Sequence, residues 1–586
     1  MKGIIMKNIF TLNQLENGLI LNCKWNENVC DITLTNTSLQ DQKLGDVTFF
    51  KAKMIFSPDT EFYGEGYNML SQYGGTIKDF NLLGSYSDYD HYKFKKPKGL
   101  NQVYNMLILY PKDQSPLLIG YSSCNRFNGW IRFNENEIQL AIDGEGILLK
   151  SGETISLEQI YISQGERNTI LNNFASAIAK NHPKREFKEI PTGWCSWLVY
   201  GPNITSKNIY DNLEAIKESN LDLKYIQIDD GYQAYWGDWF DFTDKFEGGV
   251  KNVCLDIKEK GFEPAIWVAP FVAEKDSQLF RQHPDWFVKD EGGYPLSSGD
   301  VSFGGWRCGP WYILDTTHPD ALNYIKTVFS TMHKEWKINY FKLDAIVWEA
   351  FPFGVRYDNT KTCIEAFKMG MNAIIEAVGD ESFILGGNSP MWPSIGLVNG
   401  MRVTNDNQRY FDQFQQIAKE CFHRNWQHNN LWINDPDTVL LQNQAYEIVG
   451  PDGTTITKGG DVLREEFLFN AVYTLASGGM VLSGDDISVL TKENAELLKK
   501  LLPPTNVACQ FDDTSFTIGR AKISDDKEII CVFNFDDFKK DVRVSINGKM
   551  KVLDLFENEV LGILENEISF KDFKPHYAKA LVLTRA

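Results

Sequence analysis

The sequence predicts a multidomain α/β protein with an N-terminal antiparallel β-sandwich, a central (β/α)8 TIM barrel and a C-terminal antiparallel β domain. Two observations lead to this prediction. In the middle of the chain, short apolar runs alternate with amphipathic helical patterns, whereas both ends contain strand-like runs separated by turn residues. The length of 586 residues also exceeds one compact core, since roughly 100–200 residues per domain gives about three domains.

Residues 1–164 are expected to form the β-sandwich. Gly, Asn, Asp and Pro turns there separate short runs typical of strands, for example Cys30–Leu34, Met106–Leu109 and Ile138–Ile142. Residues 165–190 should connect this region to the barrel, because helical periodicity covers 166–181 and the charged stretch HPKREFKEIP follows it.

The barrel is predicted over residues 191–504. Its eight expected strands are Gly193–Trp197, Tyr225–Asp229, Pro264–Val268, Tyr340–Asp344, Phe383–Gly387, Met401–Asn405, Leu431–Asn434 and Met480–Ser483. Helical patterns fall between them, for example Lys207–Ser219, Pro319–Trp336 and Thr362–Val378. A doubly wound sheet would share this alternation, but eight strand–helix units favour a closed barrel. Residues 505–586 return to strand-like runs and should form the C-terminal β domain: Ile529–Asn534, Val542–Ile546 and Ala580–Thr584.

The composition limits the partners. A formal net charge of -19 disfavours nucleic acid, which requires clustered Lys and Arg, and fits a neutral substrate. No run reaches the length of a signal-peptide apolar segment or of a membrane span. The ten cysteines stand singly, with neither a CxxC pair nor Cys/His spacing for zinc, which favours reduced thiols in a cytoplasmic protein.

Almost every predicted barrel strand ends in polar residues, in the stretches WCSW, QIDD, WVAP, KLD, GGN, RVTND, NDPD and SGDD. The carboxyl ends of barrel strands form one face, where barrel enzymes carry their active sites. Glycoside hydrolysis needs two carboxyl groups, about 5–5.5 Å apart for retention of configuration or about 6.5–9.5 Å for inversion. Because side chains alternate along a strand, two clusters should each share a face: Tyr340, Lys342 and Asp344, and Arg402, Thr404 and Asp406. Ion pairs that fill the barrel account for these clusters equally well.

Adjacent carboxylates and tryptophans add further candidates. Asp229 and Asp230 could bind sugar hydroxyls, chelate calcium or cap a loop, and a metal is disfavoured because no loop of metal-binding spacing lies nearby. A lone Trp usually belongs to the hydrophobic core. Four tryptophans near strand ends could nevertheless form the floor of a sugar pocket: Trp197, Trp236, Trp239 and Trp267. Four other acidic residues are interpreted as structural, in turns or as helix caps: Asp435, Asp437, Asp485 and Asp486. The sequence contains no serine-nucleophile elbow, phosphate-binding loop or dinucleotide motif.

Eight stretches resemble, in order, the α-galactosidases of glycoside hydrolase family 36, of the shorter bacterial and archaeal type. They run through most of the barrel: WCSW at 194–197, YIQIDDGY at 225–232, GDW at 237–239, IWVAPF at 266–271, HPDWFVK at 283–289, YFKLD at 340–344, SFILGGNSPMWPSIGLVNGMRVTND at 382–406 and LWINDPD at 431–437. The N-terminal region matches the family weakly in sequence, although the sandwich–barrel–β layout is similar.

The resemblance implies a retaining exo-α-glycosidase that removes terminal α-galactosyl residues from oligosaccharides and uses neither a metal nor a cofactor. It implies that Asp344 is the nucleophile and Asp406 the acid/base. The other matching positions bind substrate: Asp229 and Asp230 at O4 and O6 of galactose, Trp197 and Trp267 as pocket walls, and Lys342 and Arg402 at hydroxyls. We expect Asp344 to stay ionised beside Lys342, and burial near the nucleophile to raise the pKa of Asp406.

Three features differ from the family pattern. The family often has Cys-Gly after the fifth strand, where this chain has Gly-Asn, and Asn388 could meet a 2-acetamido group; α-N-acetylgalactosaminidase is therefore an alternative. The family can offer a Trp over the pocket, where this chain has Tyr63, Tyr67 and Tyr73. Segment Ser302–Trp311 is longer than usual and could reshape the aglycone side. A raffinose-synthase-like transferase and an inactive sugar-binding protein are further alternatives, and the sequence does not define the oligomeric state.

Overall fold

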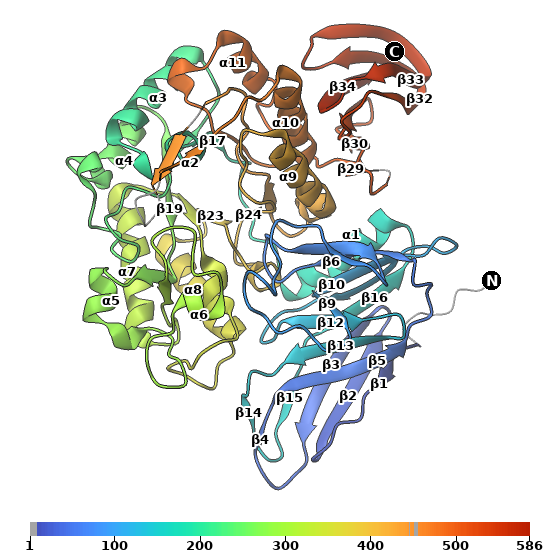
Figure 1. Cartoon of the computed structure of the whole chain (residues 1–586), viewed down its shortest axis with the longest axis vertical. Coiled ribbons are helices and arrows are strands. Elements are labelled where there is room, and N and C mark those ends of the chain that lie inside the picture. The colour runs from blue at the N-terminus through green and yellow to red at the C-terminus, as the bar shows by residue number, and fades with distance from the viewer. Residues whose placement is uncertain (1–8, 445, 450–454, 512) are drawn as a thin grey trace.

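The structure is a computed structural model and describes residues 9–444, 446–449, 455–511 and 513–586 (Figure 1). At its centre is an eight-stranded parallel sheet in the order β25-β24-β23-β22-β19-β18-β17-β28. The strands are β17 (Thr192–Cys195), β18 (Tyr225–Ile228), β19 (Glu263–Val268), β22 (Tyr340–Leu343), β23 (Phe383–Gly386), β24 (Gly400–Arg402), β25 (Ile433–Asp435) and β28 (Val481–Ser483). The Met480 N–H, next to β28, donates to the Asn434 carbonyl of β25 at 2.9 Å. The two edge strands therefore approach each other, and the sheet is a nearly closed barrel.

Each of the eight predicted barrel strands is confirmed, with ends that differ by a few residues. The sixth, β24, ends at Arg402, so Thr404 and Asp406 lie in the following loop. The prediction that these three residues alternate along one strand is therefore wrong. In this loop the Thr404 hydroxyl donates to the Asn405 carbonyl at 3.0 Å.

Helices surround the barrel (Figure 1). They are α3 (Ser206–Ser219), α4 (Val250–Glu259), α7 (Pro319–Trp336), α8 (Cys363–Val378), α9 (Phe411–Arg424), α10 (Arg464–Ser477) and α11 (Lys492–Lys499), with the shorter α2 (Trp197–Tyr200), α5 (Gln278–Gln282) and α6 (Ser298–Val301) in the loops. The three helices predicted from periodicity, α3, α7 and α8, are confirmed. A capping box begins α8: Thr362 Oγ1 accepts the Glu365 N–H, and the Glu365 carboxylate accepts the Thr362 N–H.

Two antiparallel sheets precede the barrel. The first contains β1 (Thr11–Leu12), β5 (Asp46–Lys53), β13 (Glu137–Asp143), β12 (Gly129–Phe133) and β9 (Asn101–Tyr104). The second contains β15 (Thr154–Ser156), β3 (Val29–Asn36), β16 (Ile160–Gln164), β11 (Leu117–Tyr121), β10 (Met106–Tyr110), β6 (Glu61–Glu65), β7 (Gln72–Thr76) and β8 (Phe80–Leu82), with β2 (Leu19–Asn26) on β3. Ring contacts join the two sheets, with Phe62 and Phe133 at 5.1 Å between centroids and Phe49 and Tyr121 at 6.2 Å. The predicted connecting helix is α1 (Arg167–Asn181).

A buried ion pair joins these sheets to the barrel. Arg424, at the end of α9, lies 2.7 Å from Glu65 of β6, and both side chains are fully buried. Arg424 also donates to the backbone carbonyls of Met69, Ser71 and Val403. Removing one partner of such a pair typically costs about 3–5 kcal/mol. The pair therefore holds the chain that follows β6 against the loop after β24, beside the carboxyl ends of the barrel strands.

The chain ends in a six-stranded antiparallel sheet. Its strands, in spatial order, are β29 (Gln510–Phe511), β30 (Ile518–Lys522), β31 (Lys527–Asn534), β34 (Tyr577–Arg585), β32 (Lys540–Asp554) and β33 (Glu559–Phe573). Phe469 of α10 packs edge-on against Phe533 and Phe535, which fixes this sheet to the barrel. The domain limits at residues 164, 190 and 504 stay a prediction. Among the described helices, none combines the length and apolar character that crossing a membrane requires.

Candidate active site

A cavity of about 290 Å³ opens at the carboxyl ends of the barrel strands. Eight of the ten candidate side chains line it: Trp197, Asp229, Asp230, Trp267, Lys342, Asp344, Asn388 and Asp406. Arg402 lies behind this surface against Asp406, and Trp239 is not part of the lining. The two carboxylates singled out for catalysis, which follow different strands, therefore face one cavity.

Three donors hold the Asp344 carboxylate. Its Oδ1 accepts the Ala345 N–H and the Asn388 Nδ2–H, both at 2.8 Å, and its Oδ2 accepts the Trp267 Nε1–H at 2.9 Å. Ala345 and Asn388 both have left-handed backbone, with φ of 53° and 38°. A left-handed alanine is uncommon and costs roughly 1–2 kcal/mol. The strain accompanies a turn that points a backbone N–H at the carboxylate directly after β22.

Asp406 is held by fewer donors and is more open. Its Oδ1 accepts from Arg402 Nη2 at 3.0 Å, and its Oδ2 accepts a longer hydrogen bond from Trp197 Nε1 at 3.3 Å. The Asp406 side chain is 42% exposed, whereas Arg402 is 3% exposed and also lies 3.3 Å from Asp437. Asp406 therefore presents one oxygen to the cavity while a buried guanidinium fixes the other.

The pKa values of the two carboxyl groups shift in opposite directions. Burial, opposed by Lys342 and by the hydrogen bonds from Trp267 and Asn388, raises the pKa of Asp344 above its usual value. Burial also acts on Asp406, but the positive charges of Arg402 and Lys342 outweigh it and lower the pKa of that carboxyl. The predicted order, with the higher pKa at Asp406, is therefore wrong for the substrate-free molecule. The ion pair between Arg402 and Asp406, which the sequence analysis kept open for this cluster, is present in the structure, but its effect on the pKa of Asp406 was not predicted.

A buried ion pair forms the floor of the cavity. Lys342 of β22 donates to Asp229 Oδ2 at 2.9 Å, and the two side chains are 7% and 2% exposed. Asp229 Oδ2 also accepts from Gln227 Nε2 at 2.9 Å and lies 3.5 Å from the Cys195 sulfur. Burial disfavours the charge on Lys342, but Asp229 outweighs it and raises the pKa of the ammonium. The lysine paired with Asp344 in the sequence prediction therefore forms its direct ion pair with Asp229, which follows β18, instead.

Arg307 makes a two-pronged contact with Asp230 that the sequence prediction missed. Arg307 Nε and Nη2 donate to Asp230 Oδ2 and Oδ1 at 2.8 and 2.7 Å. Asp230 Oδ1 also accepts from Gln233 Nε2 at 2.5 Å and Trp236 Nε1 at 3.1 Å. Arg307 lines the cavity and belongs to Ser302–Trp311, the segment noted as unusually long. The sequence did contain one signal for this contact, namely an arginine inside that inserted, aromatic-rich segment.

Aromatic rings form much of the wall. Trp197, Trp267 and Trp306 line the cavity. Trp239 was predicted to join them, but it is 2% exposed and packs edge-on against Trp267 at 6.1 Å between centroids. That prediction is wrong because the residue lies behind the wall, where it supports the ring that donates to Asp344.

Loops of the N-terminal region contribute Leu70, Tyr86 and His91 to the wall. His91 stacks between Tyr86 and Phe303, with centroid distances of 4.2 and 3.8 Å. Burial lowers the pKa of His91 to about 4, so the ring is neutral at physiological pH. Sequence analysis pointed to three other tyrosines of this region, and none of them lines the cavity: Tyr63, Tyr67 and Tyr73.

The remaining acidic candidates have structural contacts. Asp485 pairs with Arg409 at 2.7 Å, and Asp437 accepts the Asn407 N–H at 2.6 Å besides pairing with Arg402. Asp486 accepts the Ser488 N–H and caps a short 3-10 helix, which confirms the predicted cap. Within the described residues, no group of three or more His, Cys, Asp or Glu side chains could hold a metal ion.

Comparisons with known proteins agree with this architecture. Residues 206–381 match the family model described as Melibiase, a segment that includes Asp229, Asp230 and Asp344 and ends before Asp406. The α-galactosidase of Escherichia coli is 31% identical over 137 residues, which are 22% of this chain. The aligned part is only 18% of the length of that enzyme.

Solved structures share the fold across more of the chain. The α-galactosidase TtGalA from Thermus thermophilus, in complex with p-nitrophenyl α-D-galactopyranoside, has a TM-score of 0.65 at 18% identity and covers 88% of this chain and 98% of its own. The GH36 α-galactosidase AgaA from Geobacillus stearothermophilus has a TM-score of 0.67 at 13% identity and covers 97% and 82%. Fold and cavity define the class, a barrel protein of the glycoside hydrolase type. Within that class, residues 206–381 match the Melibiase family model, and the chain is similar in sequence to α-galactosidases.

Proposed function

We propose that the chain is a retaining exo-α-galactosidase that cleaves terminal α-galactosyl residues from oligosaccharides. One observation carries the proposal: Asp344 and Asp406, which follow the fourth and sixth barrel strands, line a single cavity with tryptophan walls. Titratable groups with shifted pKa values in such a cavity are characteristic of active sites. The free state of all ten cysteines agrees with the further proposal of a cytoplasmic location.

In the first step, Asp344 Oδ2 attacks the anomeric carbon. This oxygen accepts one hydrogen bond, from Trp267, whereas Oδ1 accepts two. Oδ2 therefore keeps more lone-pair density for bond formation. As the C1–O bond to the leaving group breaks, Asp406 gives its proton to the leaving oxygen, and a β-galactosyl ester of Asp344 forms.

Asp406 carries this proton on Oδ2, because Arg402 fixes Oδ1 as an acceptor. A bound sugar displaces water from the exposed Asp406 side chain, and this loss of solvation raises its pKa toward the value that a general acid needs. Esterification then removes the charge of Asp344, which lowers the pKa of Asp406 again. Asp406 next accepts a proton from water, the water oxygen bonds to C1, and Asp344 leaves as a carboxylate.

Galactose specificity follows from the acidic floor. Asp229 and Asp230 would accept hydroxyl protons from O4 and O6, and a sugar with an equatorial O4 would lose the hydrogen bond that the axial O4 makes to this acidic floor. Asn388 donates one Nδ2–H to Asp344, so part of its amide serves the nucleophile. We propose galactose as the preferred sugar and keep N-acetylgalactosamine as the alternative, because the Asn388 oxygen can still accept a hydrogen bond.

The test compares nitrophenyl α-galactoside with its 2-acetamido analogue, using the wild-type chain and Asp344→Gly. We expect the wild type to cleave the galactoside faster and to release α-galactose first, as followed by NMR. Asp344→Gly should lose at least about 10⁴-fold in kcat, as nucleophile removal does in other enzymes. Added azide should restore turnover and give β-galactosyl azide, a control that a misfolded variant cannot pass.

Other results would identify the alternatives. Faster cleavage of the 2-acetamido analogue would indicate an α-N-acetylgalactosaminidase, and release of β-galactose would exclude retention. A predominance of transfer products at high acceptor sugar concentration would indicate a transferase. Wild-type protein that binds galactose without cleaving any glycoside would be a sugar-binding protein.

A further inference from the structure

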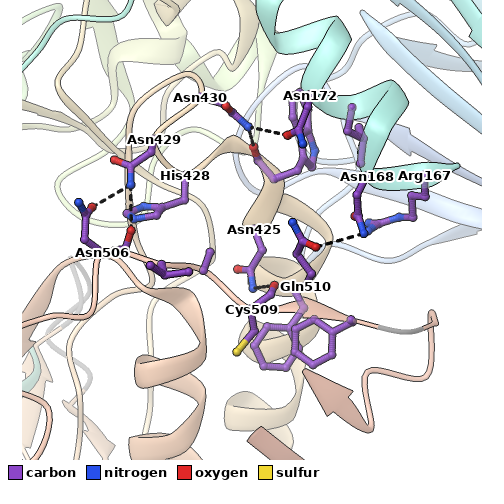
Figure 2. A pocket seen from close by; sticks show the side chains of 16 residues that line it. Arg167, Asn168, Asn172, Asn425, His428, Asn429, Asn430, Asn506, Cys509 and Gln510 are labelled. Carbon is purple, nitrogen blue, oxygen red and sulfur yellow. Dashed lines mark hydrogen bonds between the residues drawn. The ribbon is translucent and has the colours of Figure 1, made fainter. Parts of the chain in front are cut away.

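A second cavity, of about 210 Å³, lies away from the candidate active site (Figure 2). Its walls come from α1, from the chain between the end of α9 and β25, and from residues 506–511, which lead into β29. The two cavities share no lining residue. Since the loop at 425–430 precedes β25, this cavity lies toward the amino ends of the barrel strands, whereas the candidate active site lies at their carboxyl ends.

The second cavity has an apolar floor and a polar rim. Leu171, Phe422 and Phe511 are buried in the floor. The rim is made almost entirely of carboxamides: Asn168, Asn172, Asn429, Asn430, Asn506 and Gln510. A sugar ring has the matching character, because its C–H faces are apolar and its edge carries hydroxyls.

The rim carboxamides form three pairs, each joined by one amide hydrogen bond (Figure 2). Asn429 Nδ2 donates to Asn506 Oδ1 at 2.8 Å. Asn430 Nδ2 donates to Asn172 Oδ1 at 3.4 Å, and Asn168 Nδ2 donates to Gln510 Oε1 at 3.4 Å.

Each pair uses the amide nitrogen of one member and the carbonyl oxygen of the other. Every pair therefore keeps one carbonyl oxygen that can accept and one NH₂ group that can donate.

This pattern selects for hydroxyl groups. A hydroxyl both donates and accepts, so two neighbouring hydroxyls of a sugar can bond to the free oxygen and the free NH₂ of one pair. An anion needs donors only, and half of the free rim groups are acceptors. Among the described residues of the lining there is no carboxylate, and their one permanent cation, Arg167, donates Nε to the Tyr110 hydroxyl at 3.3 Å. A cationic ligand thus meets no opposite charge there.

We propose that this cavity is a non-catalytic binding site for one sugar unit of a neutral oligosaccharide. It extends the proposed function, because a chain held here would raise the local concentration of its other residues around the enzyme. The cavity is small: with about 30 Å³ per water, its volume equals roughly seven waters, enough for one pyranose ring and too little for a longer segment.

The test measures binding to the catalytically silenced Asp344→Asn chain, so it does not depend on turnover. Raffinose, maltotetraose and xylotetraose are titrated by isothermal calorimetry. We expect millimolar affinity for at least one of them. Adding Asn172→Ala and Gln510→Ala should weaken it at least tenfold, since two of the three pairs lose a member. The control is Asn173→Ala, which alters the neighbouring exposed carboxamide on α1 and should leave binding unchanged.

Soaked crystals then locate the sugar, and thermal melts confirm that each variant is folded. The proposal is overturned if no sugar binds with saturation, if the double substitution leaves the affinity unchanged, or if bound sugar is found at the candidate active site alone. It also fails if inorganic phosphate displaces the sugar from this cavity, because the cavity would then be an anion site that uses Arg167. If the wild-type chain does not cleave galactosides but sugar still binds in this second cavity, only the proposed function is refuted.

Discussion

The ammonium group of Lys342 lies 2.9 Å from the carboxylate of Asp229, and this pair links β22 to the end of β18, with β19 between the two strands. It sits beneath the cavity that also contains Asp344 and Asp406. The pair gives the floor a donor and an acceptor whose charges cancel. A neutral sugar can therefore bind above it without leaving a bare charge in a buried place.

The first prediction concerns this pair. Lys342→Met leaves Asp229 charged and unpaired, which should destabilise the fold by about 3–5 kcal/mol. Asp229→Asn should destabilise it for the same reason, by leaving the ammonium unpaired. The double variant should melt at a higher temperature than either single variant, measured by calorimetry, because no lone charge remains. Additive losses in the double variant would mean that the two side chains act independently.

The second prediction concerns Asn388. Asn388→Ala removes one of three donors to Asp344, and a hydrogen bond to a charged group is worth about 1.5–3 kcal/mol. We expect kcat on nitrophenyl α-galactoside to fall roughly 10–100-fold, while the KM changes little. In the pH profile of kcat, the pKa of the acid limb should rise, because the donor that stabilised the ionised Asp344 is lost.

Asn388→Asp provides the comparison for that experiment. It places a second carboxyl beside Asp344 and should move the acid limb further upward. A different result would contradict this role. If activity on the 2-acetamido substrate falls in Asn388→Ala while activity on the galactoside is unchanged, the amide contacts the substrate and does not position the nucleophile.

The third prediction concerns pH. Asp344 must be ionised and Asp406 protonated, but in the free enzyme the pKa of Asp344 is raised and the pKa of Asp406 is lowered. With this order only a minor fraction of the free enzyme carries the active charge pair, so the acid limb of kcat/KM should follow Asp406 and lie below the usual aspartate value of about 3.9. The alkaline limb of kcat/KM should follow Asp344 and lie above that value. The kcat profile, which reports the substrate complex, should have its alkaline limb at higher pH because bound sugar desolvates Asp406. Coincident alkaline limbs in the two profiles would contradict this mechanism.

The fourth prediction concerns Arg307. Arg307→Ala removes two donors from Asp230 and leaves that carboxylate free to repel or misplace the substrate. We expect kcat/KM to drop at least about 100-fold, since two hydrogen bonds to a charged group are lost and each is worth roughly 1.5–3 kcal/mol. Arg307→Lys keeps the charge but cannot make the two-pronged contact, so it should give an intermediate loss. Equal activity of all three proteins would mean that Gln233 and Trp236 suffice to orient Asp230.

The sequence was most informative where local patterns decide the structure. The barrel strands followed from their apolar runs, and eight site residues were predicted from strand ends and family motifs. The errors arose from contacts between distant segments. The burial of Trp239 depends on how a loop folds over Trp267. The position of His91 depends on packing between the N-terminal sheets and the barrel, which no local pattern encodes. The lowered pKa of Asp406 arises from the side-chain geometry of Arg402.

The wall formed by Leu70, Tyr86 and His91 ties the shape of the cavity to a part of the chain more than 250 residues before Asp344. The N-terminal region and the barrel thus form one concave surface together, and the ion pair between Glu65 and Arg424 joins them. Recombination that exchanged either region alone would combine two parts of the cavity wall whose sequences had diverged separately. Selection on what the cavity accepts should therefore act on both regions at once, and their surface positions should co-vary across related lineages.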